Sequence, residues 1–233
     1  MKDREIDDVL NEAARVPHAV EPALLRRAAE SMKASLRPVR PLPSTPVLTA
    51  GLVLICAAVA LLGAAVAGFY GIEKMTVWER ALIFSTLGVL AWAAATEFAN
   101  GMIPGSRRRM SPGALLGMGS LLLVGVFAFL FRDYRVEQFF SVGIVCLATG
   151  LLYAVPAAFL SWLVLRRGFA ANPVSTGLVA GTLAGLAGVG MLELHCPNFE
   201  AAHVLVWHVA VVPLSAAIGA LVGRALRFRQ GLR

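Results

Sequence analysis

Residues 47–67 read VLTAGLVLICAAVALLGAAVA, a run of 21 residues without a single charge. A helix of roughly 20 apolar residues crosses the hydrocarbon core of a bilayer. Five further apolar runs follow at about 81–99, 112–131, 139–165, 174–192 and 204–226. The chain is 58% hydrophobic and 15% charged, whereas soluble domains are about 25% charged. The sequence therefore predicts an all-α, polytopic membrane protein with six transmembrane helices.

The fourth of these runs is the longest and contains Pro156. A proline inside a membrane helix kinks it without necessarily ending it. No polar residues surround Pro156 that could form a turn, so we expect one tilted or kinked helix.

Lys and Arg residues are distributed unequally between the two sides of the predicted helices. Positive residues accumulate in cytoplasmic segments, so the side that holds more of them is assigned to the cytoplasm. The outer loops then carry four: Lys74, Arg80, Arg132 and Arg135. The inner flanks carry eleven: Arg37, Arg40, Arg107, Arg108, Arg109, Arg166, Arg167, Arg224, Arg227, Arg229 and Arg233. This asymmetry predicts that both termini are cytoplasmic.

We divide the chain into a cytosolic head (residues 1–45), a membrane domain (residues 46–228) and a basic tail (residues 229–233). The head is expected to form two short amphipathic helices, the first ended by Pro17 and the second begun by Pro22, followed by an extended connector from Pro38 to Pro46. Its apolar residues could fill a groove on a partner protein or lie on the lipid surface, and the sequence leaves both open. The candidate contacts are Val9, Leu10, Leu24, Leu25 and Met32.

Small residues recur every four positions in the last two predicted helices. This spacing lets two membrane helices approach closely, so we expect the fifth and sixth helices to pack together. A homodimer face is the alternative. The residues concerned are Gly177, Gly181 and Gly185 on the fifth helix, and Gly219 and Gly223 on the sixth.

The segment LELHCPNFEAAH, residues 192–203, is predicted to lie on the outer side. Cys146 lies about two turns into the fourth helix from that side, so it could meet Cys196, whereas Cys56 starts from the inner side. A thiol pair can bind soft metals or oxidise to a disulfide. His195 and His203 are candidates to assist a metal. The simpler interpretation is that the cysteines are unreactive and that the histidines form hydrogen bonds at an interface. We expect no resident cofactor beyond transient heavy-metal binding.

Other functional classes have weaker support. No nucleophile elbow, phosphate loop or long basic-aromatic run is present, so neither catalysis nor direct nucleic-acid binding is expected. A small-molecule transporter or channel is an alternative, but it needs polar groups near the midplane, and no buried ion pair is visible in the spans. A membrane thiol oxidoreductase is a further alternative.

The last third of the chain resembles the NrsF family of bacterial membrane-embedded negative regulators of sigma-F factors, which belong to the extracytoplasmic-function class. The matching features are LRRG at 165–168, Pro173, the glycine-rich fifth helix, LHCP at 194–197, Trp207, Gly219 and Gly223. The six-span layout and the short cytosolic head also fit.

The resemblance implies an anti-sigma factor of the bacterial inner membrane whose head holds a sigma factor. It also implies that heavy-metal or oxidant stress is sensed at two thiols, which correspond to Cys146 and Cys196. The released sigma factor, not this protein, would contact DNA. The sequence departs from the family pattern in the head and at His208, where we expect a tyrosine.

Overall fold

The computed structural model describes residues 22–35, 42–103, 105–106, 108–136, 138–166, 168, 170 and 172–231. It divides into two units, residues 1–41 and residues 42–233. In the first unit, α2 (Pro22–Ser35) begins at Pro22, and Leu25 is 57% exposed on it. Val9 and Leu10 lie outside the described residues, as do the side chains of Leu24 and Met32.

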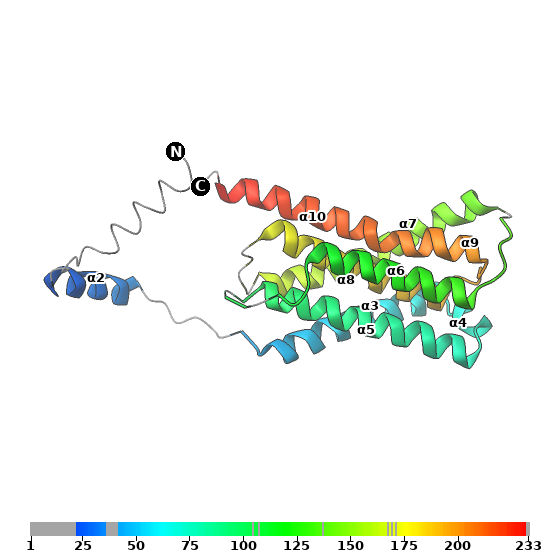
Figure 1. Ribbon diagram of the computed structural model, residues 1–233, viewed down its shortest axis with the longest axis horizontal. Helices are drawn as coiled ribbons and strands as arrows, with labels where there is room; N and C mark the ends of the chain where they lie inside the picture. Colours follow the sequence, from blue (N-terminus) through cyan, green and yellow to red (C-terminus); the bar gives the residue numbers. More distant parts are fainter. Residues whose placement is uncertain are drawn as a thin grey trace. The chain divides into compact units, whose positions relative to one another are not determined.

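The second unit is built from long helices (Figure 1). They are α3 (Thr45–Ala67), α5 (Val77–Gly101), α6 (Pro112–Leu130), α7 (Phe139–Leu165), α8 (Pro173–His195) and a last helix made of α9 (Ala201–His203), η1 (Val204–His208) and α10 (Val209–Gly231). A short helix, α4 (Tyr70–Lys74), lies between α3 and α5. Six described helices are long and apolar enough to cross a membrane, so the predicted all-α, six-span fold is confirmed.

Two helix starts differ from the prediction, whereas the fourth span agrees with it. The extended connector was expected to reach Pro46, but Pro46 lies in the first turn of α3, where proline is well tolerated. The second span begins at Val77 because Thr76 and Glu79 form a reciprocal capping box there. The fourth span continues through Pro156 as the single helix α7.

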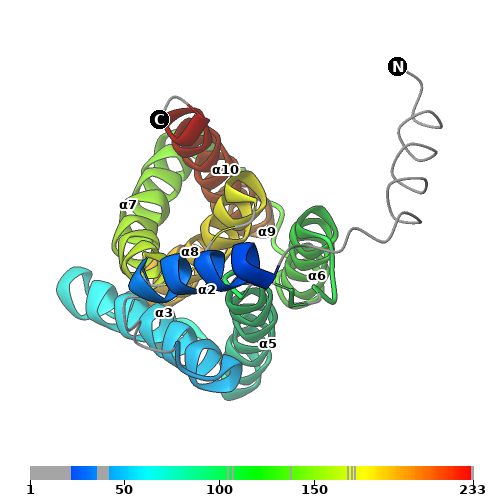
Figure 2. The same ribbon diagram turned by 90° about the vertical axis from the view of Figure 1, so that its left-hand side faces the viewer.

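Helix α8 forms the centre of the bundle. Viewed along the helices, α3, α5, α7 and α10 surround it, and each of them contacts it (Figure 2). In its most apolar segment 83% of α8 is buried, compared with 22–44% for the other five spans. The other helices expose large apolar side chains, among them Leu54, Leu62, Val89, Leu121, Phe159 and Leu221. Lipid is the solvent in which such a surface is favourable.

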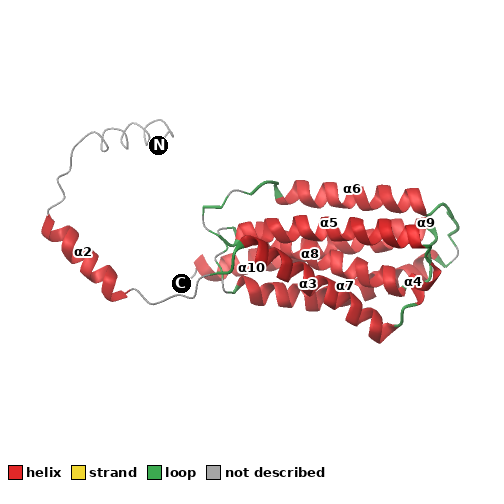
Figure 3. Ribbon diagram, turned by 90° about the horizontal axis from the view of Figure 1, so that it is seen from below, coloured by secondary structure: helices red, strands yellow, loops and turns green. Residues whose placement is uncertain are grey.

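Helix α6 is the most peripheral span (Figure 3). It packs on α5, α8 and the last helix, and the side chain of Leu90 on α5 lies over Gly119. Three of its other glycines, Gly113, Gly117 and Gly125, have open space where a side chain would project.

Glycines allow α8 and α10 to pack backbone against backbone. A methyl group added at Gly177 would overlap the carbonyl oxygen of Gly219, and one added at Gly181 would overlap that of Ser215. At Gly185 it would lie 2.8 Å from the Cα atom of Val212. Gly219 and Gly223 face the backbone of α8 in the same way. Close approach of this kind gives membrane helices their packing energy.

The three segments that join the predicted outer ends of the helices lie together at one end of the bundle, which we call the LHCP end. The ammonium group of Lys74 donates a hydrogen bond to the carbonyl oxygen of Pro197, at 3.3 Å. The N–H of Ala201 donates to the carbonyl oxygen of Asp133, at 2.6 Å. Asp133 is exposed, and a hydrogen bond from Arg135 lowers its pKa. These contacts hold the segment 196–200 in place over the ends of the helices.

The opposite end of the bundle holds the loops that follow α5 and α7. Arg108 donates a hydrogen bond to the hydroxyl group of Thr176 on α8, at 3.3 Å. The buried carboxylate of Glu97 accepts a hydrogen bond from the backbone N–H of Arg109, at 3.1 Å. Glu97 therefore fixes the loop after α5 at this end.

Candidate functional site

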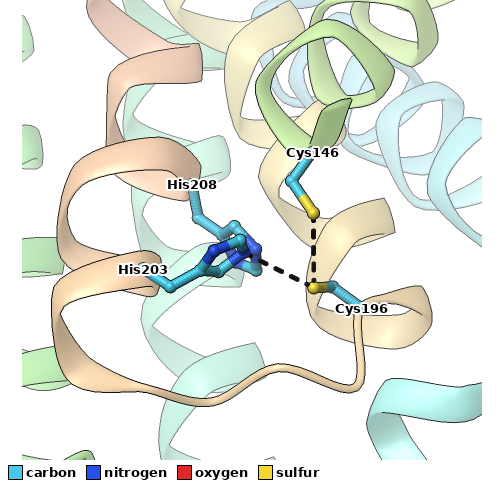
Figure 4. Close-up of side chains that lie close together, drawn as sticks. All are labelled: Cys146, Cys196, His203 and His208. Carbon is cyan, nitrogen blue, oxygen red and sulfur yellow. Dashed lines mark hydrogen bonds between the residues drawn. The ribbon is translucent and has the colours of Figure 1, made fainter. Parts of the chain in front are cut away.

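The sulfur atoms of Cys146 and Cys196 lie 3.4 Å apart at the LHCP end (Figure 4). Cys146 is half-buried on the second turn of α7, and Cys196 is buried directly after the last residue of α8. All three cysteines are free thiols. Residues 50 positions apart in the sequence are thus brought within van der Waals contact.

Cys56 does not share this site. It is buried in α3, and its thiol lies 3.8 Å from the carbonyl oxygen of Leu183. Leu183 precedes Cys196 by 13 residues along α8, which corresponds to about 20 Å of helix. The structure therefore contains one close pair of thiols and one distant thiol.

Two histidines complete the cluster around the thiol pair. The Nε2 atom of His203 lies 3.7 Å from the sulfur of Cys196, and the rings of His203 and His208 are in edge contact, 5.2 Å between their centroids. Both imidazoles are fully buried. One potential ligand atom from each of Cys146, Cys196, His203 and His208 lies within 4.8 Å of the other three. We call these four residues the Cys2His2 cluster (Figure 4).

The π-helix η1 explains how two histidines five positions apart share one face. In an α-helix each residue turns the chain by about 100°, so positions i and i+5 point about 140° apart. A π-helical turn bonds residue i to residue i+5, and its wider winding brings these positions much closer in direction than an α-helix does. The π turn occupies Val204–His208, just before Pro213, which cannot donate a hydrogen bond inside the helix. The local backbone thus directs both rings toward Cys196.

Glu193 supports the cluster from α8. Its Oε1 atom lies 2.7 Å from Nδ1 of His208, and neither side chain has exposed surface. The sequence placed residue 193 in a loop beyond the fifth span, and this is wrong, because Glu193 lies in α8 and forms a buried hydrogen-bonded pair with His208. Helix α8 continues to His195, which carries Glu193 into the interior to meet His208.

His195 lies outside the cluster. Its Nδ1 atom lies 3.1 Å from the carbonyl oxygen of Gly68, and its ring contacts that of Tyr70. It thus packs against the segment between α3 and α4 on the other side of the α8 terminus. His203 is brought to the thiols and His195 is not.

The surroundings of Cys196 favour the neutral thiol in the free protein. The hydrogen bond with Cys146 raises the pKa of Cys196, and burial raises it further. The nearby imidazoles of His203 and His208 act in the opposite direction. The thiol of Cys196 is therefore held protonated, although it lies close to two imidazoles and to a second sulfur.

Two sulfur atoms and two imidazole nitrogens at these distances offer two chemistries. The thiols can lose two electrons and two protons to an oxidant and form a disulfide, whose sulfurs are about 2.05 Å apart. Alternatively, the deprotonated thiols and neutral imidazoles can bind a metal ion. The pattern of the sequence identified Cys146, Cys196 and His203, but it missed His208 and Glu193. Their pairing depends on the π turn, and the hydrophobic periodicity of the sequence gives no sign of such a turn.

A family model with the description "NrsF: Negative regulator of sigma F" matches residues 32–228 of the chain. The match spans all six membrane-spanning helices and includes the whole Cys2His2 cluster. No curated protein and no solved structure matches the chain at a significant level.

Proposed function

From the premise that this chain belongs to the NrsF family of negative regulators of sigma F, we propose that it is a membrane-embedded anti-sigma factor. It sequesters an extracytoplasmic-function sigma factor at the bacterial inner membrane and releases it on heavy-metal or oxidative stress. The match over residues 32–228 is the observation that carries this proposal, because it covers the entire helical bundle.

The proposed sigma-binding element is the cytosolic head, residues 1–45. In support, α2 is an amphipathic helix that leaves Leu25 57% exposed, although apolar side chains of this size favour burial. An amphipathic helix of this kind binds by laying its apolar face into a groove of its partner. The partner-binding residues proposed are Val9, Leu10, Leu24, Leu25 and Met32.

The proposed sensing element is the pair Cys146 and Cys196. Their 3.4 Å separation supports this role, because a thiol-reactive metal or an oxidant could engage both sulfurs at once. The two cysteines lie where α7 meets the end of α8, and glycines of α8 pack against the backbone of α10. A change at the thiols would therefore alter the packing of these helices, and we place the sigma-release signal in that change.

The transporter alternative has less support. A cavity of about 720 Å³ lies between α7, α8 and α10. Its lining is almost entirely apolar, as at Leu151, Val155 and Ile218. A polar solute would need hydrogen-bonding groups at this depth. The pairing of Glu193 with His208 lies near the LHCP end instead of the midplane.

Co-purification tests sigma binding. The full chain, purified in detergent from cells that make an extracytoplasmic-function sigma factor, should bring that factor with it. Leu25→Asp places a charge on the proposed contact and should reduce the bound sigma factor at least tenfold. Ser31→Asp adds the same charge at another exposed position of α2 and serves as the matched control. Recovery of no sigma factor with the wild-type chain would overturn the proposal.

A reporter for the sigma-dependent genes tests the sensing role. Cadmium or an oxidant should induce the reporter in cells with the wild-type chain. Cys146→Ser and Cys196→Ser should abolish this induction, whereas Cys56→Ser should leave it intact because Cys56 is far from the pair. Normal induction in the double variant Cys146→Ser/Cys196→Ser would show that the signal is sensed elsewhere.

A further inference from the structure

The Cys2His2 cluster has the composition of a metal site, and its dimensions can be compared with one. In a tetrahedral zinc site with Zn–S near 2.3 Å and Zn–N near 2.0–2.1 Å, two sulfurs are about 3.8 Å apart and a sulfur and a nitrogen about 3.6 Å. The sulfurs of Cys146 and Cys196 are 3.4 Å apart, and Cys196 Sγ is 3.7 Å from His203 Nε2. These two spacings are within a few tenths of an ångström of the tetrahedral values, and all four ligand atoms lie within 4.8 Å of one another.

The hydrogen bond from His208 to Glu193 selects the ring atom that can bind a metal. An ionised carboxylate only accepts hydrogen bonds, so Nδ1 of His208 carries the proton at the 2.7 Å contact. In the neutral imidazole, which is the form that binds a metal, the lone pair is then on Nε2, which is buried and has no hydrogen-bond partner among the described residues. Metal-bound histidines commonly donate their other N–H to a carboxylate in this way. Glu193 therefore occupies the place of a positioning residue.

A buried nitrogen lone pair without a donor costs free energy unless something satisfies it. A cation at the centre of the cluster would satisfy His208 Nε2, His203 and both sulfurs together. Two thiolates and two neutral imidazoles would balance the charge of a divalent ion.

We propose that Cys146, Cys196, His203 and His208 form a tetrahedral binding site for a divalent d10 ion, zinc or its toxic analogue cadmium, with Glu193 orienting His208. On binding, the ion replaces the two thiol protons, which pass to solvent, and no atom changes oxidation state. Four protein ligands complete the coordination shell, which is typical of structural or sensory sites and leaves no position for a substrate. The proposal rests on the proposed sensing function for its biological meaning, whereas metal binding can be measured without a sigma factor.

The four ligands come from two parts of the bundle, so a bound ion would connect these parts. Cys196, His203 and His208 all come from the hairpin that joins α8 to α10, whereas Cys146 comes from α7. A bound ion would therefore tie α7 to this hairpin at the LHCP end. The same helices already touch at Gly188, where a side chain would overlap the carbonyl oxygen of Gly150.

The first test uses the purified full chain in detergent, reduced and kept free of oxygen. It should bind one Cd²⁺ per chain, with the ultraviolet absorption of sulfur–cadmium bonds, and should not retain Mg²⁺. X-ray absorption of the Zn²⁺-loaded wild type should show two sulfurs at about 2.3 Å and two imidazole nitrogens at about 2.0–2.1 Å. Absence of bound metal, or a shell with sulfur but no imidazole, would overturn the proposal without reference to any variant.

The second test uses matched variants. Cys146→Ser, Cys196→Ser, His203→Gln and His208→Gln should each weaken Cd²⁺ binding by at least 100-fold, whereas Cys56→Ser and His195→Gln should leave it unchanged. Glu193→Gln keeps the side-chain size and an acceptor oxygen but removes the carboxylate charge, and it should weaken binding about 10–100-fold, as mutation of an outer partner of a ligand does. Wild-type affinity in both histidine variants would reduce the site to a thiol pair and refute the four-ligand proposal. If these variants do not fold, the absorption measurement on the wild type decides.

The results separate this inference from the anti-sigma proposal. Metal binding with the expected ligands, combined with failure to co-purify a sigma factor, would retain the metal site and reject the anti-sigma role. Sigma binding by a chain that binds no metal would retain the anti-sigma role and reject the metal site.

Discussion

The Nδ1 atom of His208 lies 2.7 Å from the Oε1 atom of Glu193, and the two residues come from different membrane-spanning helices with no exposed surface on either side chain. A hydrogen-bonded charge in an apolar interior is costly to leave without its partner. The pair therefore stabilises the contact between α8 and the last helix and also orients the imidazole toward the thiols.

Replacing Glu193 with alanine should destabilise the protein by about 1–3 kcal/mol, because the buried N–H of His208 would lose its acceptor. The unfolding midpoint in detergent, followed by tryptophan fluorescence, measures this effect. Glu73→Gln, at an exposed position of α4, is the control and should change stability by less than about 0.5 kcal/mol. Equal midpoints for Glu193→Ala and Glu73→Gln would show that the buried pair contributes nothing.

Adding a methyl group at Gly181 should destabilise the bundle by about 1–3 kcal/mol, because the new Cβ atom overlaps the backbone of α10 at Ser215. Gly88→Ala is the matched control, since its Cβ atom would project into open space on α5. Thermal unfolding of both variants in the same detergent tests the difference. Wild-type stability in Gly181→Ala would mean that α8 and α10 do not approach this closely.

A mild oxidant should convert Cys146 and Cys196 into a disulfide, with two electrons passing to the oxidant, and should leave Cys56 reduced. Labelling with a maleimide polymer before and after oxidation counts the remaining thiols and should fall from three to one. In Cys146→Ser no intramolecular disulfide should form, so two thiols should remain. Loading with Zn²⁺ before oxidation should protect the pair if the four residues bind the ion. A disulfide that includes Cys56 would contradict the arrangement of the helices.

The inside location of both termini remains a prediction from the Arg and Lys asymmetry, and reporter fusions can test it. A green fluorescent protein fused after Arg233 should be fluorescent, because it folds in the cytoplasm. Alkaline phosphatase inserted after Asn198 should be active, because that enzyme needs the oxidising periplasm. The opposite pair of results would place the head on the wrong side for a sigma factor and the thiols on the cytoplasmic side.

The sequence predicted the membrane fold with good accuracy because apolar length is a local property. Runs such as 47–67 leave no soluble alternative, and Pro156 could be assigned to the interior of one helix because no polar turn residues surround it. The four-residue glycine spacing also indicated which faces of the last two spans are small. Where caps intervene, as at Thr76 and Glu79, the helix began earlier than the apolar run itself.

The composition of the candidate site was decided only by the tertiary structure. The sequence placed Cys146 and Cys196 at the same end of the bundle, but contact between them depends on how α7 packs on α8. His195 and His203 were equal candidates by position, yet the end of α8 turns His195 toward Gly68 and the π turn brings His208 beside His203. The physical reason is that apolar periodicity defines helices one at a time, whereas the direction of each polar side chain depends on local winding and on the partner it meets across the bundle.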